Sequence, residues 1–174
     1  MLINKEIPTP ARVFDATAEA VVDFGTRNAW NLPMGDAFED VSARIGGLQP
    51  HLERHFGLTL ADHEGPTLLM YPPGSFYEPH VDRAAGDEPH GAVRARRVSI
   101  VIFVNATRPQ PQADEYAGGA LTFYGLIDDP VWRDYGFAID PAPGLLVAFP
   151  SHLRHEVTPV TAGDRYTIVD WFTA

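Results

Sequence analysis

The stretch Arg165-Tyr-Thr-Ile-Val-Asp-Trp171 decides the fold class, because its composition is that of a β-strand with one internal face. On a strand, positions 165, 167, 169 and 171 point to the same side. A tryptophan on the solvent side is unfavourable, so we expect this side to be internal. Arg165 then lies inside the protein, where a guanidinium is costly without an anionic partner. The stretch predicts a β-rich interior that holds a carboxylate, which a planar guanidinium matches with two parallel hydrogen bonds. The alternative is a surface arginine.

Period-two patterns extend outward from this stretch through the last two thirds of the chain. The predicted strands are residues 67–72, 97–104, 120–124, 145–149, 156–160 and 165–172. Turn-rich segments separate them, and two of these, residues 83–96 and 106–118, are candidate loops over a site. The arginines at 83, 94, 96 and 97 could recognise an acidic substrate there, or could simply be solvated.

The first third of the chain is helical in texture. One helix is predicted from Asp15 or Thr17 to about Asn28. Apolar residues at spacings of three and four predict a second one from Phe38 to Phe56, kinked or split at Gly46-Gly47 and Pro50. Helices followed by strands predict a mainly β, α+β fold, with residues 1–66 as helical support on one sheet and residues 67–172 as a β-barrel core.

His80-Val-Asp82 and His155 carry the second signal. On a strand, His80 and Asp82 would point to the same face. Two imidazoles and one carboxylate can occupy one face of an octahedral ion and leave three positions open, as in non-haem Fe(II) sites. An isolated H-x-D tripeptide is weak evidence, and a turn histidine paired with an aspartate is the alternative. The combination with His155 and Arg165 favours a metal site beside an anion site.

Composition limits the class of protein. The length of 174 residues fits one domain. A net charge of −10 argues against nucleic acid or an anionic membrane as a partner. The absence of cysteine excludes disulfides and thiolate chemistry. Residues 1–13 have no apolar leader pattern, so a cytoplasmic location is expected. The oligomeric state stays open.

Several motifs in order resemble the prolyl-hydroxylase branch of the 2-oxoglutarate/Fe(II) oxygenases, over residues 67–172. They are Tyr71-Pro-Pro-Gly74, Tyr77-Glu-Pro-His80-Val-Asp82, Arg97-Val-Ser-Ile-Val-Ile-Phe-Val-Asn105, Gly118-Gly-Ala-Leu-Thr-Phe123, Pro143-Gly-Leu-Leu-Val-Ala-Phe-Pro150, His155-Glu-Val-Thr-Pro159 and Arg165-Tyr-Thr-Ile-Val-Asp-Trp171. Arginine at 165 is typical of the oxygen-sensing and bacterial types. The resemblance implies a double-stranded β-helix, a jelly-roll or cupin-like barrel.

The resemblance also implies roles for individual residues. Fe(II) would be bound by His80, Asp82 and His155, and the 5-carboxylate of 2-oxoglutarate by Arg165. Positions that line the pocket in the family fall on Tyr71, Leu121, Val157 and Trp171, and Thr167 could add a hydroxyl contact. One position departs from the family, because Phe103 stands where a tyrosine helps to hold the 5-carboxylate. The missing hydroxyl would come from Tyr71, Ser99 or Thr167.

The implied reaction is hydroxylation of an unactivated C–H bond with O2, releasing succinate and CO2, with ascorbate as a possible reductant. A prolyl residue in a protein or peptide is the first expectation, and a free amino acid or small natural product is the alternative. Asp82 favours hydroxylation over halogenation, because related halogenases have a small residue there. A cupin-like binding or sensing module without turnover is a third interpretation, which an intact ligand triad disfavours.

Overall fold

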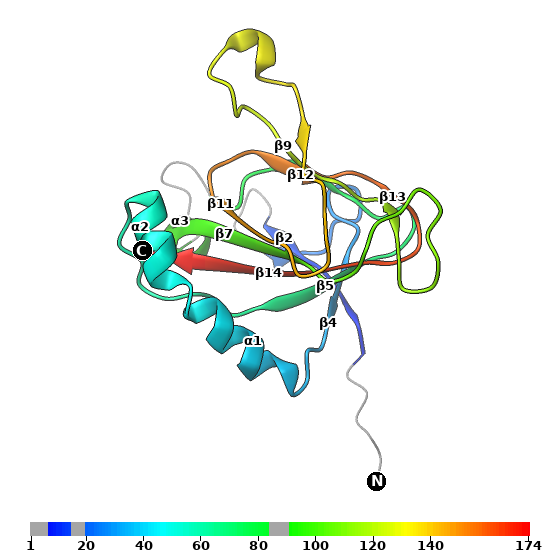
Figure 1. Ribbon diagram of the computed structural model, residues 1–174, viewed down its shortest axis with the longest axis horizontal. Coiled ribbons are helices and arrows are strands. Elements are labelled where there is room, and N and C mark those ends of the chain that lie inside the picture. Colours follow the sequence, from blue (N-terminus) through cyan, green and yellow to red (C-terminus); the bar gives the residue numbers. More distant parts are fainter. Residues whose placement is uncertain (1–6, 15–19, 84–90) are drawn as a thin grey trace.

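The computed structural model describes residues 7–14, 20–83 and 91–174, and these form a mainly β structure with few helices (Figure 1). The helices are α1 (Ala37–Gly46), α2 (Gln49–Phe56), α3 (Gly91–Ala95) and a 3-10 turn, η1 (Pro130–Trp132). The strands are β1 (Thr9–Pro10), β2 (Val13–Phe14), β3 (Ala20–Val21), β4 (Trp30–Leu32), β5 (Thr67–Tyr71), β6 (Tyr77–His80), β7 (Arg96–Phe103), β8 (Ala117–Gly118), β9 (Leu121–Phe123), β10 (Phe137–Ala138), β11 (Leu146–Pro150), β12 (His155–Val157), β13 (Val160–Ala162) and β14 (Arg165–Thr173).

Two sheets make up most of the structure. The larger has six strands in the order β1-β4-β5-β14-β7-β11, and the smaller has four in the order β10-β9-β12-β6. All of their pairings are antiparallel, and β14 lies between β5 and β7 at the centre of the larger sheet. The strands predicted at 67–72, 97–104, 120–124, 145–149 and 165–172 are confirmed within one or two residues. The strand predicted at 156–160 is divided into β12 and β13 around Pro159, which has no N–H to donate.

The two helices α1 and α2 cover the outer face of the larger sheet, while β9 and β12 lie on its other side (Figure 1). Ile45 and Leu52 from these helices pack with Val98, Ile100 and Phe172 of the sheet. The split expected near Gly46-Gly47 and Pro50 is confirmed. The first helix ends at Gly46, and Pro50 sits in the first turn of the second, where a missing N–H costs nothing.

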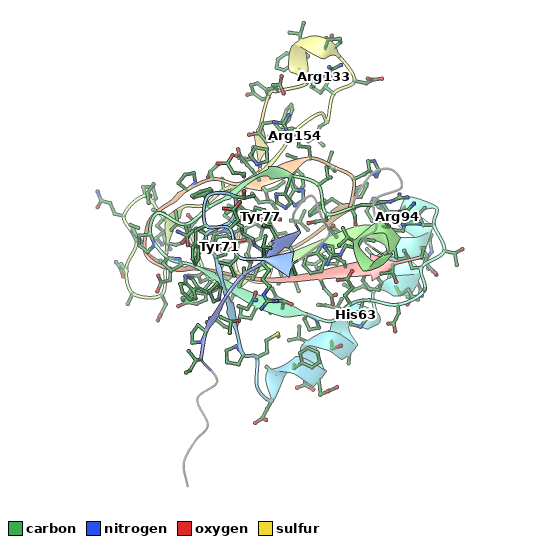
Figure 2. All side chains as sticks on the ribbon, turned by 180° about the vertical axis from the view of Figure 1, so that it is seen from behind. His63, Tyr71, Tyr77, Arg94, Arg133 and Arg154 are labelled. Atoms are coloured by element: carbon green, nitrogen blue, oxygen red, sulfur yellow. The ribbon has the colours of Figure 1, made fainter. Side chains whose placement is uncertain are left out.

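Apolar side chains also fill the space between the two sheets. Val101 and Phe103 of β7 meet Leu121 and Phe123 of β9, and Leu69 of β5 belongs to a second cluster that includes Val157 and Val160. Figure 2 shows Tyr71 and Tyr77 inside the body of the protein, between these layers. The interior face of β14, which carries Arg165 and Thr167, points into the same layer.

The helix predicted from Asp15 or Thr17 to about Asn28 is wrong over its described part. Residues 20–28, which were predicted as the end of a helix, contain strand β3 and a turn, while residues 15–19 lie outside the described part. Strands β1 and β4 extend the larger sheet through pairing with β5. These N-terminal strands are only two or three residues long, so their pairing partners, rather than any periodicity, determine their structure.

An arm formed by the long β9–β10 connection projects away from the smaller sheet (Figures 1 and 2). Its apolar residues Leu126, Val131 and Tyr135 are exposed, and Arg154 at its base pairs with Asp134 at 3.1 Å. In the described part of the chain, no helix is long and apolar enough to cross a membrane.

Asp170 anchors the segment before β5 to the outer face of β14. Its carboxylate is fully buried and accepts hydrogen bonds from the backbone N–H groups of Gly65 at 3.0 Å and Trp171 at 2.7 Å. The Nδ1 atom of His63 lies 2.7 Å from the same carboxylate. Burial raises the pKa of Asp170, and the contact with His63 opposes that rise. These hydrogen bonds fix the strand next to Trp171, which faces the interior cavity.

We predict that Asp170→Ala lowers the free energy of unfolding by about 2 to 3 kcal/mol, because it leaves buried N–H groups without an acceptor. Urea denaturation measures this. Asp36→Ala is the matched control, since Asp36 is exposed at the start of α1 and its side chain caps no N–H. The control should change stability by less than about 0.5 kcal/mol. Equal losses in the two variants would contradict the anchoring role.

Candidate metal centre and adjoining cavity

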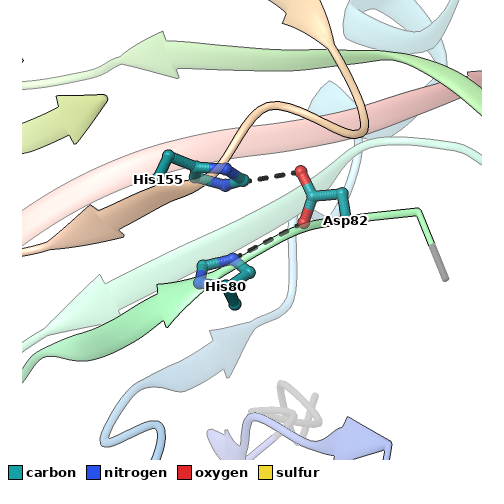
Figure 3. Close-up of side chains that lie close together, drawn as sticks. All are labelled: His80, Asp82 and His155. Atoms are coloured by element: carbon teal, nitrogen blue, oxygen red, sulfur yellow. Dashed lines mark ion pairs between the residues drawn. The ribbon is translucent and has the colours of Figure 1, made fainter. Parts of the chain in front are cut away.

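Three potential metal ligands meet where the smaller sheet ends (Figure 3). His80 is the last residue of β6 and lies opposite His155, the first residue of β12, in the antiparallel register. His80 and Asp82 were predicted to lie on one strand. This prediction is wrong, because β6 ends at His80. Instead, the backbone N–H groups of Asp82 and Arg83 both donate to the carbonyl of Ser151, and this turn brings the carboxylate back toward the imidazoles.

The distances suit a shared ion better than a direct contact. The Nε2 atom of His80 is 3.6 Å from one Asp82 oxygen, and the Nε2 atom of His155 is 3.5 Å from the other. Both distances are longer than the donor–acceptor distance of an ordinary charge-assisted hydrogen bond. One ligand atom from each residue lies within 4.8 Å of the other two. The three side chains therefore surround a point that a metal ion can occupy.

Hydrogen bonds to the backbone orient both imidazoles. The Nδ1 atom of His80 lies 2.7 Å from the carbonyl oxygen of Glu78, and that of His155 lies 2.9 Å from the carbonyl oxygen of Leu153. An imidazole that donates from Nδ1 keeps its lone pair on Nε2, the atom that faces Asp82. Metal-bound histidines in proteins are commonly fixed in this way.

Electrostatics at the centre also fit a cation. Burial lowers the pKa of His155, which keeps this imidazole neutral and able to act as a ligand. Burial alone would raise the pKa of Asp82, but the neighbouring His80, His155 and Ser99 together hold it well below its usual value. An imidazole lone pair and an ionised carboxylate are both good ligands for a divalent cation, so the residues present fit a bound metal such as Fe(II).

One cavity brings together the predicted metal ligands and the residues predicted to hold the cosubstrate. It contains the three candidate ligands and the six residues predicted to hold a cosubstrate, which are Tyr71, Leu121, Val157, Arg165, Thr167 and Trp171. Positions 165, 167, 169 and 171 of β14 all face it, as the alternation predicted. Their placement is a structural fact, whereas the role of each residue remains a prediction.

Arg165 is the most unusual of these residues. It is 1% exposed, and its guanidinium lies 5.1 Å from the ring centre of Tyr71 and 5.4 Å from that of Phe103. Its Nη1 donates to the Thr167 hydroxyl at 3.3 Å, but Nε and Nη2 have no hydrogen-bond partner among the described residues. Unpaired donors on a buried cation are costly. The arrangement fits an anion, such as a carboxylate, that arrives from the cavity.

A glycine makes room for this arginine. Gly119 has a φ of 61°, and a Cβ atom built on it would lie 2.8 Å from Cδ of Arg165 and 2.8 Å from Cγ2 of Val160. Its neighbour Gly118 has a φ of 72°, and its Cβ would lie 2.5 Å from the Pro159 carbonyl oxygen. Only glycine combines this backbone with so close an approach. Gly119 thus serves the position of Arg165, and Gly118 the close packing against Pro159.

The hydroxyl that Phe103 lacks has two candidate sources beside Arg165. Tyr71 and Thr167 both lie there, but Ser99 does not serve this end, because its hydroxyl donates to Ser151 at 3.0 Å and interacts with Asp82. Tyr116 was not identified from the sequence as a residue of this site. It is fully buried, its hydroxyl has no hydrogen-bond partner in the described structure, and burial raises its pKa while Arg165 opposes the rise.

Tyr116 belongs to a segment that was predicted to be a loop over the site. Its backbone N–H donates to the Ala106 carbonyl at 3.0 Å, and its own carbonyl accepts from the N–H of Arg108 at 2.8 Å. These bonds fix the end of residues 106–118 inside the protein. The only sequence signal was the position of Tyr116 just before the Gly118-Gly119 pair.

The cavity is also lined by three further arginines, Arg12, Arg27 and Arg96. Of the arginines predicted to face a substrate, only Arg96 lines this cavity; Arg97 instead donates to the carbonyls of Arg94 and Arg96. Arg12 and Arg27 were missed, because they lie in the N-terminal part that was predicted as helical support. Tyr77, also missed, lines the cavity and stacks on His80 with ring centres 3.5 Å apart.

Sequence comparison connects this geometry with known proteins. The profile of the 2OG-Fe(II) oxygenase superfamily matches residues 66–173. A PKHD-type hydroxylase of Sphingopyxis alaskensis is 35% identical over 104 residues, which is 60% of this chain and 41% of that protein. Another PKHD-type hydroxylase, from Synechococcus elongatus, is 35% identical over 101 residues, which is 58% of this chain and 39% of that protein. The match therefore covers about two fifths of the length of these relatives.

Solved structures agree in fold. A prolyl-4-hydroxylase of Pseudomonas putida has a TM-score of 0.67 at 26% identity, over 95% of this chain and 77% of that one. A prolyl hydroxylase from Trichoplax adhaerens, in complex with a peptide fragment of the hypoxia-inducible factor oxygen degradation domain, has a TM-score of 0.71 at 22% identity, over 95% and 70%. With the profile match extending over more than half of the sequence, the chain belongs to the 2OG-Fe(II) oxygenase superfamily, a family that works with Fe(II), 2-oxoglutarate and O2.

Proposed function

We propose that this protein is a 2-oxoglutarate- and Fe(II)-dependent hydroxylase, with a prolyl residue of a peptide or protein as the first candidate substrate. The observation that carries the proposal is that one cavity holds the His80–Asp82–His155 cluster together with a buried Arg165 whose Nε and Nη2 have no hydrogen-bond partner among the described residues. Either feature alone has a simpler explanation. The histidines and Asp82 alone could be an ion pair, and Arg165 alone could be a buried structural arginine.

His80, Asp82 and His155 are assigned to the metal, and Arg165 is assigned to the 5-carboxylate of 2-oxoglutarate. When bound, iron and 2-oxoglutarate would supply the oxidising power: one oxygen atom of O2 would be incorporated into succinate with loss of CO2, and the other into the hydroxyl group of the product. The protein supplies position. Thr167 and Tyr71 lie beside the guanidinium, while Leu121, Val157 and Trp171 form walls of the cavity that limit access of water.

We further infer that residues 1–174 form a single domain and that its two sheets constitute a double-stranded β-helix. Support for the barrel comes from the facing six-stranded and four-stranded antiparallel sheets with an apolar layer between them. The structural likeness to prolyl hydroxylases supports the same assignment. A peptide substrate is supported by the Trichoplax adhaerens relative, which was solved with a peptide bound.

The metal assignment predicts a spectroscopic signal. Anaerobic addition of Fe(II) and 2-oxoglutarate should produce the weak visible charge-transfer band of the iron–cosubstrate complex. His80→Ala and Asp82→Ala should abolish it, with metal affinity reduced by more than roughly 100-fold, since even the loss of an outer partner of a ligand costs about 10- to 100-fold. His152→Ala is the matched control, because His152 is exposed and does not line the cavity. A band that survives in both triad variants would overturn the assignment.

Catalysis is tested on the same samples by admitting air and measuring succinate with and without a prolyl peptide. Succinate that rises with the peptide, together with a hydroxylated product, is the expected result. An intact band with no succinate for any peptide or amino acid would instead identify the protein as a binding module.

The next prediction concerns the space around Arg165. Gly119→Ala should weaken binding of 2-oxoglutarate by about 10-fold or more, because its Cβ would displace the guanidinium from the cavity. Gly74→Ala is the matched control: Gly74 also has a positive φ, of 84°, but its Cβ would meet no atom within 4 Å. Both variants carry the strain of a left-handed backbone, and Gly119→Ala adds a close contact with Val160, so thermal unfolding is used to check that both are folded at the assay temperature. Equal affinities for 2-oxoglutarate in the two variants would contradict the role of Gly119.

A further inference from the structure

The charges that line the cavity do not balance once the proposed cofactors are counted. The two positive charges of Fe(II) balance the two negative charges of 2-oxoglutarate, and the negative charge of Asp82 balances the positive charge of Arg165. Within the described residues, Asp82 is the only acidic side chain that lines the cavity, whereas Arg12, Arg27 and Arg96 line it as well. This local excess of positive charge stands out in a protein with a net charge of −10. It indicates that a further anion belongs there.

Arg96 is already neutralised. Its Nε and Nη2 donate to the two carboxylate oxygens of Glu64, each at 2.6 Å, and its guanidinium lies 3.8 Å from the ring centre of Trp171. A guanidinium that is paired by two parallel bonds and stacked on an aromatic ring is held in place. Arg96 is therefore a wall of the cavity, and the unbalanced charge lies on Arg12 and Arg27.

Arg27 has no carboxylate partner among the described residues. Its Nη1 donates to the carbonyl of Arg12 at 3.1 Å, and its Nε is buried without a hydrogen-bond partner. No carboxylate of the described residues lies within ion-pair distance of Arg27 or Arg12. An unpaired donor on a partly buried cation favours an anionic ligand, as it does for Arg165.

The position of Arg27 relative to the metal centre is fixed by strand β6. The backbone of Arg27 bridges that of Tyr77, and the neighbouring Asn28 N–H donates to the Phe76 carbonyl at 3.0 Å. The guanidinium lies 4.7 Å from the ring centre of Tyr77, and the other neighbour of that ring is His80, with ring centres 3.5 Å apart. Arg27 is thus separated from a candidate iron ligand by a single aromatic ring.

We propose that Arg27, with Arg12 beside it, binds a carboxylate of the substrate, so that the substrate carries this group a few bonds from the C–H that is hydroxylated. The proposal rests on the proposed function above and names the substrate class for it. Two sources supply the same chemistry: the free α-carboxylate of an amino acid, and an acidic side chain next to the target residue in a peptide. Arg27 and Arg12 are specificity-determining residues in this assignment.

The test uses the full-length protein with Fe(II) and saturating 2-oxoglutarate under anaerobic conditions, and follows the change of the charge-transfer band on adding matched probes. L-Proline against L-prolinamide tests a free α-carboxylate. Acetyl-Pro-Asp-amide against acetyl-Pro-Asn-amide tests an acidic side chain. We expect the carboxylate member of one pair to bind about 10- to 100-fold more tightly than its amide, as for a lost charge-assisted bond. The responding pair identifies the source.

Arg27→Met should abolish this preference, and Arg27→Lys should retain part of it because the charge remains. Arg12→Met, at an exposed position that does not threaten folding, should reduce the preference by a smaller factor. Arg108→Met is the control, since Arg108 is exposed, pairs with Glu115 at 2.7 Å and does not line the cavity. It should leave the preference unchanged.

Two results would overturn the assignment while leaving the hydroxylase intact: equal binding of both members in each pair, or a preference that persists in folded Arg27→Met. The absence of the band in the wild-type protein would overturn the proposed function, and this assignment with it. The two failures are therefore distinguishable in one experiment.

Discussion

The buried guanidinium of Arg165 is the constraint on which the rest of the site depends. A cation with two unpaired donors lies in the middle of the larger sheet, between the rings of Tyr71 and Phe103. It stays there because β14 is paired on both sides, with β5 and with β7, so the strand cannot shift its register to expose the arginine. The fold thus holds an unfavourable charge in place until an anion enters, and that is a property of a binding site rather than of a packed core.

The candidate metal centre depends on backbone hydrogen bonds at the ends of strands rather than on strand pairing. Its three residues come from the ends of elements, where β6 stops, β12 starts and a turn bonded to Ser151 lies between the sheets. Backbone carbonyls orient both imidazoles, so the geometry survives although Asp82 lies outside regular structure. Rigid orientation with open coordination positions is what a catalytic ion requires, because substrate and O2 must reach it.

The sequence predicted the parts of the fold whose patterns are long enough to show a period. Strands such as β7 and β14, with eight and nine residues, alternate clearly, and from this alternation the interior position of Arg165 followed. The short N-terminal strands gave no such signal, since β1 and β4 become strands through pairing with residues far away in the sequence. Tyr116 was missed because it lies in a turn-rich segment whose sequence has no period that indicates burial, although its backbone bonds to Ala106 and Arg108 hold it inside the protein.

The residues assigned to the reaction and the residues assigned to substrate recognition lie in different parts of the chain. The family match, residues 66–173, includes the candidate ligands and Arg165. Arg12 and Arg27 lie outside that match, on N-terminal segments that reach the cavity because Arg27 bridges Tyr77. Membership of the superfamily therefore indicates Fe(II), 2-oxoglutarate and O2 and leaves the substrate open. The substrate class that we propose depends on Arg12 and Arg27. Their position in the cavity follows from the fold of the N-terminal segments onto β6, and neither the family profile nor the period of any strand predicts it.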